Sequence, residues 1–322
     1  MKQTNKIALV VAYFGRFPNY FPLWVKSCSY NPTIDFWIFT DQIIEDHPAN
    51  VKCVKMTLLE MKNRATEVLG FNATLSRPYK CCDYKPIYGL MFADYLQHYD
   101  YWGHCDIDLI FGDLQTFFDR YNLYSYDKFG MLGHLSLFKN NENVNKAYLI
   151  PNDHMDYHDV FTNEKNMAFD ELPGISTIMK ESGFKVFWRR IFIDIATMYH
   201  RYRITDVYPL DEKPINYKQQ TFYWDRGKSY HVYLKDGNIC KDEYLYIHFQ
   251  KRPNYQVSLS LLSAESFFIT NAGFVTGSLD TMGKKDFQKL NPYFGKVYET
   301  IENIINSCKR RILGYLKRKL NK

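Results

Sequence analysis

The chain contains 322 residues, of which 24% are charged and 17% are aromatic. This composition is typical of a folded globular protein and excludes an intrinsically disordered chain. No run of about 18 apolar residues is present, so we expect no transmembrane helix. The first apolar run, at residues 7–14, is not followed by a small-residue cleavage site and predicts a buried strand rather than a signal peptide.

The cysteines indicate the redox compartment of the protein, and the charge distribution bears on nucleic-acid binding. There are seven cysteines, an odd number, and no C-x-x-C motif, which favours free thiols in a reducing, cytoplasmic compartment. The net charge of +6 is concentrated in residues 309–322, which hold seven basic residues and no acid. The rest of the chain holds 34 of the 41 basic residues and all 35 acidic residues. It therefore has no excess of basic residues that would favour nucleic-acid binding.

The first third of the chain predicts alternating strands and helices. Residues 7–13 (IALVVAY) and 35–40 (DFWIFT) are β-favouring apolar runs, and residues 20–29 between them have a helical pattern. Further helices are expected at 57–69 and 85–99. A strand, a helix and a second strand are the opening of an α/β fold.

The rest of the chain predicts shorter elements. They are a helix after Asp113, a strand at 129–132, an asparagine-rich loop at 140–145, a helix at 169–182, a strand at 184–188, a hairpin joining 221–224 to 230–234, and a last clear strand at 244–249. From residue 297 onward, apolar residues at helical spacing predict an amphipathic helix whose other side gathers the basic residues.

Two carboxylates, Asp106 and Asp108, stand at the end of an apolar strand-like run. Residues i and i+2 of a strand point to the same face, so these side chains should converge if the chain stays extended. Converging carboxylates repel each other and are costly to desolvate unless a cation joins them. A divalent metal that carries a diphosphate would satisfy both, whereas an acidic loop after a strand is the alternative interpretation.

Four stretches, taken in their order and spacing, resemble one group of enzymes. They are VVAYFG (10–15), FWIFTD (36–41), DYKPIYG followed by CDIDLIFGDL (83–89 and 105–114), and YIHFQKR (246–252). In these the chain resembles GT-A fold glycosyltransferases, which use nucleotide sugars and an Asp-x-Asp metal motif. Within that class it is similar to bacterial capsule and lipopolysaccharide enzymes.

The resemblance implies a GT-A, Rossmann-like α/β fold with a mixed, mainly parallel sheet flanked by helices. It also implies a catalytic domain at 1–290, composed of a nucleotide-binding part (1–135) and an acceptor-binding part (136–290). Residues 291–322 would then form the basic, membrane-associating helix.

The resemblance further implies a Mn²⁺ or Mg²⁺ ion held by Asp108 and by Asp106, which alternatively contacts the ribose of the nucleotide. His248 would be a third ligand, and imidazole suits Mn²⁺ better than Mg²⁺. Lys251 and Arg252 would offset the charge of a departing nucleoside diphosphate. A core histidine and a solvated surface pair are the alternatives for these positions.

The same resemblance places the nucleotide at the ends of the first two strands. Asp41 would lie near the base and ribose, and Lys85, at a helix start, would approach the donor phosphates or sugar. The turn after the first strand would contact the base, with an aromatic ring stacked on uracil; its residues are Ala12, Tyr13 and Phe14. Ordinary strand-end and surface positions are the alternatives.

Asp170 and Glu171 are the candidate catalytic acids. In similar inverting enzymes an acidic residue at such a helix start deprotonates the acceptor hydroxyl, and the resemblance slightly prefers Asp170. The helix dipole alone also favours acids there. The stereochemistry stays open, because such a base favours inversion whereas the segment from His248 to Lys251 is closer to the retaining branch.

Together these features predict a hexosyltransferase that is peripheral to the inner face of the cytoplasmic membrane. It would transfer a hexose from a UDP-sugar donor to a lipid-linked glycan acceptor, and the resemblance alone implies galactose as the preferred sugar. The basic helix would bind the anionic membrane surface, unless it simply docks on the body. The rival functions are a nucleotidyl- or phosphotransferase that uses the same carboxylates and a non-catalytic peripheral membrane protein.

Overall fold

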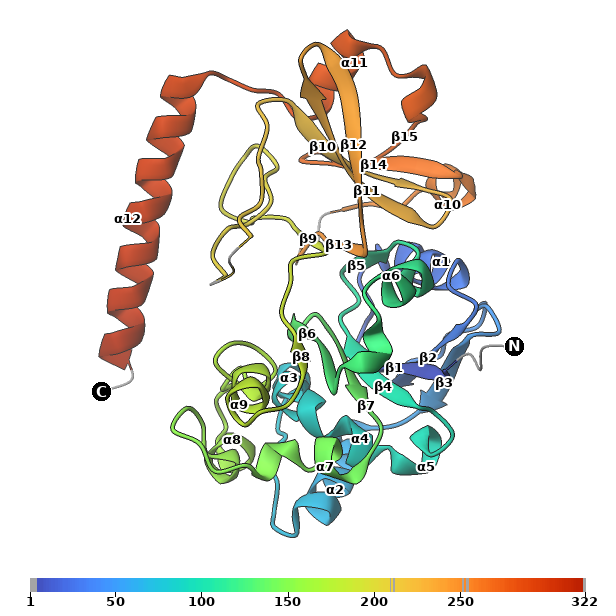
Figure 1. Ribbon diagram of the computed structural model, residues 1–322, viewed down its shortest axis with the longest axis vertical. Coiled ribbons are helices and arrows are strands. Elements are labelled where there is room, and N and C mark those ends of the chain that lie inside the picture. Colours follow the sequence, from blue (N-terminus) through green and yellow to red (C-terminus); the bar gives the residue numbers. More distant parts are fainter. Residues whose placement is uncertain (1–4, 209, 211, 251, 253–254, 321–322) are drawn as a thin grey trace.

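Three β-sheets organise the chain in the computed structural model, which describes residues 5–208, 210, 212–250, 252 and 255–320 (Figure 1). The largest sheet has seven strands in the order β3–β2–β1–β4–β7–β6–β8. Its strands are β1 (Ile7–Ala12), β2 (Ile34–Thr40), β3 (Val51–Lys55), β4 (Tyr101–Cys105), β6 (Lys128–Leu132), β7 (Leu135–Lys139) and β8 (Val186–Phe187). The pairs from β3 to β4 and from β6 to β8 are parallel, and β7 is antiparallel to both of its neighbours.

Helices cover both faces of this sheet. They are α1 (Phe21–Ser29), α2 (Leu58–Leu69), α3 (Cys81–Tyr84), α4 (Tyr88–Met91), α5 (Ala93–Leu96), α6 (Leu114–Arg120), α7 (Glu142–Asn145), α8 (Tyr157–Thr162) and α9 (Ile175–Glu181). Alternate residues of β1 join different hydrophobic clusters: Leu9 packs with α1 and α6, and Val10 packs with α2, α4 and α9. A mixed, largely parallel sheet between helices is a GT-A-like arrangement, so the predicted fold class is confirmed.

A second sheet of five antiparallel strands lies at the other end of the molecule (Figure 1). In sheet order it contains β12 (Asn238–Tyr244), β11 (Lys228–Lys235), β10 (Gln220–Asp225), β14 (Ser266–Thr270) and β15 (Gly273–Thr276), with α10 (Leu259–Ser263) and α11 (Lys284–Leu290) beside it. The predicted hairpin is confirmed: Asp225 pairs with Lys228 across a two-residue turn in which Arg226 and Gly227 have positive φ.

A small third sheet connects distant parts of the chain. It contains β5 (Leu109–Phe111), β13 (Tyr246–His248) and β9 (Ile193–Asp194), with β13 in the middle. The last helix, α12 (Lys296–Leu320), stands beside the body in Figure 1. No helix in the described part of the chain is long and apolar enough to cross a membrane.

Local signals are confirmed where a helix carries its own caps. Thr57 and Glu60 form a capping box at the start of α2, with the Thr57 hydroxyl accepting from the Glu60 N–H and the Glu60 carboxylate accepting from the Thr57 N–H. Gly70 ends the helix in the left-handed conformation, with φ of 74°. These contacts lie within a few residues of each other, and the helix expected at 57–69 is confirmed.

The prediction of a single helix at 85–99 is wrong. The segment is divided into α4 and α5 with a break at Phe92, whose φ is −117° and ψ is 28°. The ring of Phe92 is fully buried and stacks on Phe39 with 3.9 Å between centroids. A Cβ on Gly89 would come within 2.3 Å of Trp102. Tertiary packing of aromatic rings therefore overrides the helical periodicity.

Three other expectations are also corrected. The helix expected at 169–182 starts only at Ile175, because Asp83 accepts the N–H groups of Met167 and Phe169 and holds the preceding chain in a non-helical path. The loop expected at 140–145 contains α7, since the Asn141 side chain caps it by accepting the Val144 N–H at 3.0 Å. The strand at 244–249 is shorter than expected and is not the last, because β14 and β15 follow it.

Candidate active site

The small sheet brings the predicted metal ligands together. β4 ends at Cys105, and the next three residues lead from Asp106 directly into β5. β13 places His248 opposite Leu109, the neighbour of Asp108, on one side and opposite Asp194 on the other. The pairing therefore holds one imidazole between two carboxylates that are far apart in the sequence.

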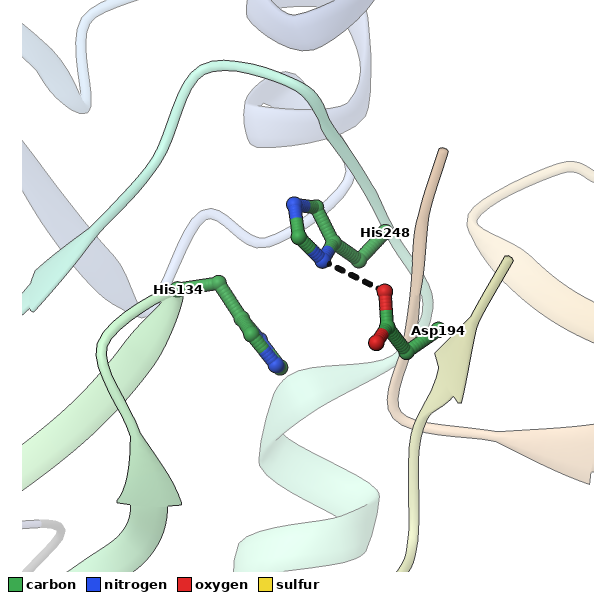
Figure 2. A group of neighbouring side chains, drawn as sticks. All are labelled: His134, Asp194 and His248. Carbon is green, nitrogen blue, oxygen red and sulfur yellow. Dashed lines mark ion pairs between the residues drawn. The ribbon is translucent and has the colours of Figure 1, made fainter. Parts of the chain in front are cut away.

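His248 contacts both carboxylates. Its Nε2 lies 3.5 Å from Asp108 Oδ1, and its Nδ1 lies 2.8 Å from Asp194 Oδ1, the ion pair drawn in Figure 2. Burial disfavours the charged imidazole, but Asp108 and Asp194 outweigh burial and hold the pKa of His248 well above its usual value. Burial also raises the pKa of Asp108, yet His248 more than offsets this and the net shift is downward.

Asp194 is the site residue that sequence reasoning missed. It is fully buried, and its carboxylate accepts hydrogen bonds from the Tyr208 hydroxyl at 2.6 Å and from Gln250 Nε2 at 2.8 Å. Burial raises the pKa of Asp194, but His248 and the Tyr208 hydroxyl lower it by more, so the net shift is downward. The signal that could have found it is an apolar run that ends in an acid (IFID, 191–194), the pattern that also marks Asp106 and Asp108.

His134 lies against this pair, as Figure 2 shows, with its ring stacked on His248 at 4.5 Å between centroids. Its Nδ1 lies 2.8 Å from the Tyr246 hydroxyl, and its buried Nε2 has no hydrogen-bond partner among the described residues. Burial lowers the pKa of His134 to about 3, so the ring is neutral. His134 is a second residue that the sequence did not single out.

Two overlapping triplets have ligand atoms within 4.8 Å of one another: Asp106, Asp108 and His248, and His134, Asp194 and His248. They differ in access. The Asp106 side chain is 34% exposed, whereas Asp194 is buried and its oxygens are already engaged. A catalytic metal needs an open position for substrate, so the first triplet is the better fit. His248, the third residue of that triplet, is then oriented by Asp194.

Lys85 contacts Asp106, a member of the first triplet. Its Nζ is 2.7 Å from Asp106 Oδ1, 2.8 Å from Asp170 Oδ2 and 2.8 Å from the carbonyl oxygen of Gly133. An ammonium group has three N–H donors, and these contacts engage all of them. Burial lowers the pKa of Lys85, but Asp106 and Asp170 raise it by more, so the amine is charged.

Asp170 and Glu171 occupy different environments. Asp170 is buried on Lys85, while Glu171 is only half-buried. Burial and the neighbouring Asp170 raise the pKa of Glu171 to about 7. Both carboxyls lie over Gly133, where a Cβ would come within 2.3 Å of Asp170 Oδ2 and 2.9 Å of Glu171 Oε1. The glycine therefore permits this close approach.

Most of the predicted site residues line one cavity of about 710 Å³. They are Ala12, Tyr13, Phe14, Lys85, Asp106, Asp108, Asp170, Glu171 and His248. Tyr20, Cys82, His134, Tyr208 and Gln250 line it as well. The cavity lies at the carboxyl ends of β1 and β4, which is where open α/β sheets bind ligands.

Two predicted residues do not line this cavity, and a third lies outside the described residues. Asp41 accepts the N–H of Gly15 at 2.9 Å and so holds the turn that follows β1. Arg252 does not line the cavity; its guanidinium lies 4.8 Å from the centre of the Tyr202 ring and contacts the Ala196 carbonyl at 3.4 Å. Lys251 lies outside the described residues.

The charged side chains that line the cavity favour the binding of a cation. Among the described residues that line it, four carboxyl groups outnumber two cationic groups, the engaged ammonium of Lys85 and the imidazole of His248, whose pKa is raised. A diphosphate would therefore meet excess negative charge unless a divalent ion came between them. Two carboxylates and an imidazole are a donor set that suits Mn²⁺. The residues present thus fit the predicted ion.

Comparison with known proteins places the chain in a family. A model of a family of unknown function, DUF6625, matches residues 9–278. The chain belongs to this family. No curated protein matches the chain. Among solved structures it is similar to the galactosyltransferase LgtC in complex with donor and acceptor sugar analogues, with 9% sequence identity over 58% of this chain and 75% of that chain and a TM-score of 0.31. At this level the likeness carries no argument about function.

Proposed function

We propose that this protein is a metal-dependent glycosyltransferase that transfers a hexose, with galactose preferred, from a UDP-sugar to a lipid-linked glycan of the bacterial surface. One observation carries the proposal: Asp106, Asp108 and His248 converge in the wall of a cavity large enough for a nucleotide sugar. Lys85 and His248 partly offset the charge of the two carboxylates, and a divalent cation would complete this compensation where a diphosphate binds.

Asp106, Asp108 and Nε2 of His248 would hold the ion, and the imidazole would give up its Nε2 proton on metal binding. A bound Mn²⁺ or Mg²⁺ supplies Lewis-acid stabilisation of the negative charge on a departing diphosphate. Asp194 forms an ion pair with Nδ1 of His248, and Nε2 of the same ring lies toward Asp108. Partners of this kind fix the orientation of a metal-binding imidazole.

The donor lies along the carboxyl ends of β1 and β4. The half-buried ring of Tyr13 lines the cavity and is available to stack on a uracil base. Asp41 acts indirectly, by fixing Gly15 and thus the turn that carries Tyr13 and Phe14. Lys85 positions Asp106 rather than binding phosphate, because its three donors are engaged.

Glu171 rather than Asp170 accepts the proton of the acceptor hydroxyl. Asp170 is committed to Lys85, whereas Glu171 is half-buried and lines the cavity. A carboxyl with a pKa of about 7 is well matched to proton transfer near neutral pH. The acceptor is a sugar hydroxyl, and its proton moves to the Glu171 carboxylate as the new glycosidic bond forms.

The helix α12 holds the enzyme at an anionic membrane surface, where a lipid-linked acceptor is displayed. Its polar side faces the body: Glu299 pairs with Arg201 at 3.1 Å, and Asn306 Nδ2 donates to the Met198 carbonyl at 2.7 Å. Its apolar residues are exposed on the opposite side, with Ile301 52% and Ile304 58% exposed. An outward apolar face followed by basic residues is typical of a helix that lies in a membrane interface.

Calorimetric titration of UDP with and without Mn²⁺ tests the proposal. We expect UDP to bind with Mn²⁺ and to lose most of its affinity without it, and Asp108→Asn to abolish metal-dependent binding with little change in melting temperature. Binding of UDP that ignores both the metal and this substitution would contradict the proposed function.

A further inference from the structure

A second cavity adjoins the first. Its volume is about 760 Å³, and Glu171 and Tyr208 stand in the walls of both cavities. The two spaces therefore lie beside the residue that we propose to be the base. Nothing in the donor-binding scheme uses the second space.

The walls of this second cavity combine an aromatic platform with polar groups. Leu132 and Leu172 form an apolar side, and Trp188 presents a half-buried ring. Thr177 and Glu181 are the polar residues beside them, and the Glu181 carboxylate is also paired with His154 at 2.8 Å. Small-molecule sites have this composition, with apolar walls and a few convergent polar groups.

The Trp188 ring packs against the core and is covered by one exposed side chain. The ring is approached by the ammonium of Lys180, which lies 4.3 Å from the ring centre. Lys180 is an exposed side chain on a flexible stem, so it can move aside or donate a hydrogen bond to a ligand that covers the ring. A pyranose ring offers an apolar face of C–H groups to an aromatic plane and hydroxyl groups to the polar rim.

We propose that this second cavity binds the terminal hexopyranose of the acceptor glycan, stacked on Trp188, with one hydroxyl directed at Glu171. The inference rests on the proposed function and names the acceptor subsite of that same active site. In the reaction, the bond between the sugar C1 and the diphosphate oxygen breaks, and its electron pair leaves with the nucleoside diphosphate. The acceptor oxygen forms a bond to C1, and its proton passes to the Glu171 carboxylate.

The experiment observes Trp188 directly. The full chain is labelled with 5-fluorotryptophan, and the Trp188 resonance is assigned by Trp188→Phe. Methyl glycosides of glucose, galactose and N-acetylglucosamine are titrated with and without Mn²⁺ and UDP. We expect at least one glycoside to shift the Trp188 resonance saturably while leaving Trp37 in place. Trp37 is the matched control, because it is also half-buried with a lysine, Lys52, 5.7 Å from its ring centre.

A binding variant supplies an independent measurement. Trp188→Ala should weaken glycoside binding about tenfold or more while UDP affinity in Mn²⁺ changes less than about twofold, since one pocket contact is worth this much discrimination. Thr177→Val keeps the volume of the side chain and removes a hydroxyl, so it should also weaken glycoside binding. It replaces Trp188→Ala in this measurement if that variant fails to fold. Trp37→Phe should alter neither affinity.

The outcomes separate the two proposals. If no glycoside moves Trp188 while UDP binds with Mn²⁺, the acceptor subsite is wrong and the donor site stands. If octanoate moves Trp188 and the glycosides do not, the cavity holds a lipid tail and the inference is overturned. If glycosides bind and UDP does not, the sugar subsite stands and the proposed transferase function fails.

Discussion

Lys85 and Asp106 form an ion pair of 2.7 Å that connects a proposed metal ligand to the interior of the protein. The amine also reaches Asp170, so that one cation fixes two acids that line the cavity. Sequence reasoning assigns Lys85 to the donor phosphates, but its contacts favour a positioning role. The two roles make different predictions for substitutions.

Lys85→Met should destabilise the fold by about 3 kcal/mol, because it removes the partner of two largely buried carboxylates. Urea denaturation measures this change, and Mn²⁺ affinity should fall as Asp106 loses its support. Lys146→Met is the matched control, since it breaks an exposed pair with Glu142 and should leave unfolding nearly unchanged. Weaker UDP binding with unchanged stability would instead indicate a phosphate contact.

Asp194→Asn should weaken Mn²⁺ binding about 10–100-fold, the usual effect of losing the partner that orients a metal-binding imidazole. Tyr208→Phe removes one hydrogen bond from Asp194 and keeps its charge, so it should have a smaller effect. Calorimetry with Mn²⁺ measures both variants. Equal affinity in Asp194→Asn and the unaltered protein would mean that His248 does not bind the metal through Nε2.

Glu171→Gln should lower kcat about 10²–10⁴-fold, the usual contribution of a general base, and leave UDP affinity unchanged. In the unaltered enzyme, kcat/KM should rise with pH through about 7, because only the deprotonated carboxylate accepts a proton and the pKa of Glu171 is raised to about 7. This rise should disappear in the variant. A pH profile that Glu171→Gln does not alter would exclude Glu171 as the base.

Gly133→Ala should disrupt the site, because the new Cβ would lie within 2.3 Å of Asp170 and 2.9 Å of Glu171. Overpacking of this kind costs about 1–3 kcal/mol and should displace Glu171, so turnover falls together with melting temperature. Gly283→Ala is the control, because its Cβ would meet Asp286 at an ordinary 3.6 Å. Full activity in Gly133→Ala would show that Glu171 need not lie where the structure places it.

Ile301→Asn combined with Ile304→Asn should release the full chain from anionic liposomes. Both residues lie on the outward face of α12 and away from its contacts with Arg201 and Met198, so the fold should be kept. These substitutions are preferable to truncation, which would also remove Glu299 and Asn306 from the body. Flotation with the liposomes measures the effect, and undiminished binding would remove the proposed role of the helix.

The candidate site could be predicted where its chemistry is local. Asp106 and Asp108 follow a buried strand, and the order of the surrounding motifs points to the same end of the sheet. His248 could be proposed as their partner only through the resemblance, because 140 residues separate it from Asp108. The resemblance covered neither Asp194, for which the only signal was the acid that ends the run 191–194, nor His134; the pairing of β13 with β9 and the turn between β6 and β7 bring them into the site.

The local elements were determined by the sequence itself. The strands of the parallel half, the capped helix α2 and the hairpin at Arg226-Gly227 depend on apolar runs, caps and turn residues that lie within a few positions of one another. Tertiary structure decided which side chains meet. It broke the helix at Phe92, committed Lys85 to Asp106 and Asp170, and set His248 between Asp108 and Asp194. Such contacts join distant segments whose pairing depends on the packing of the whole core, which no local pattern records.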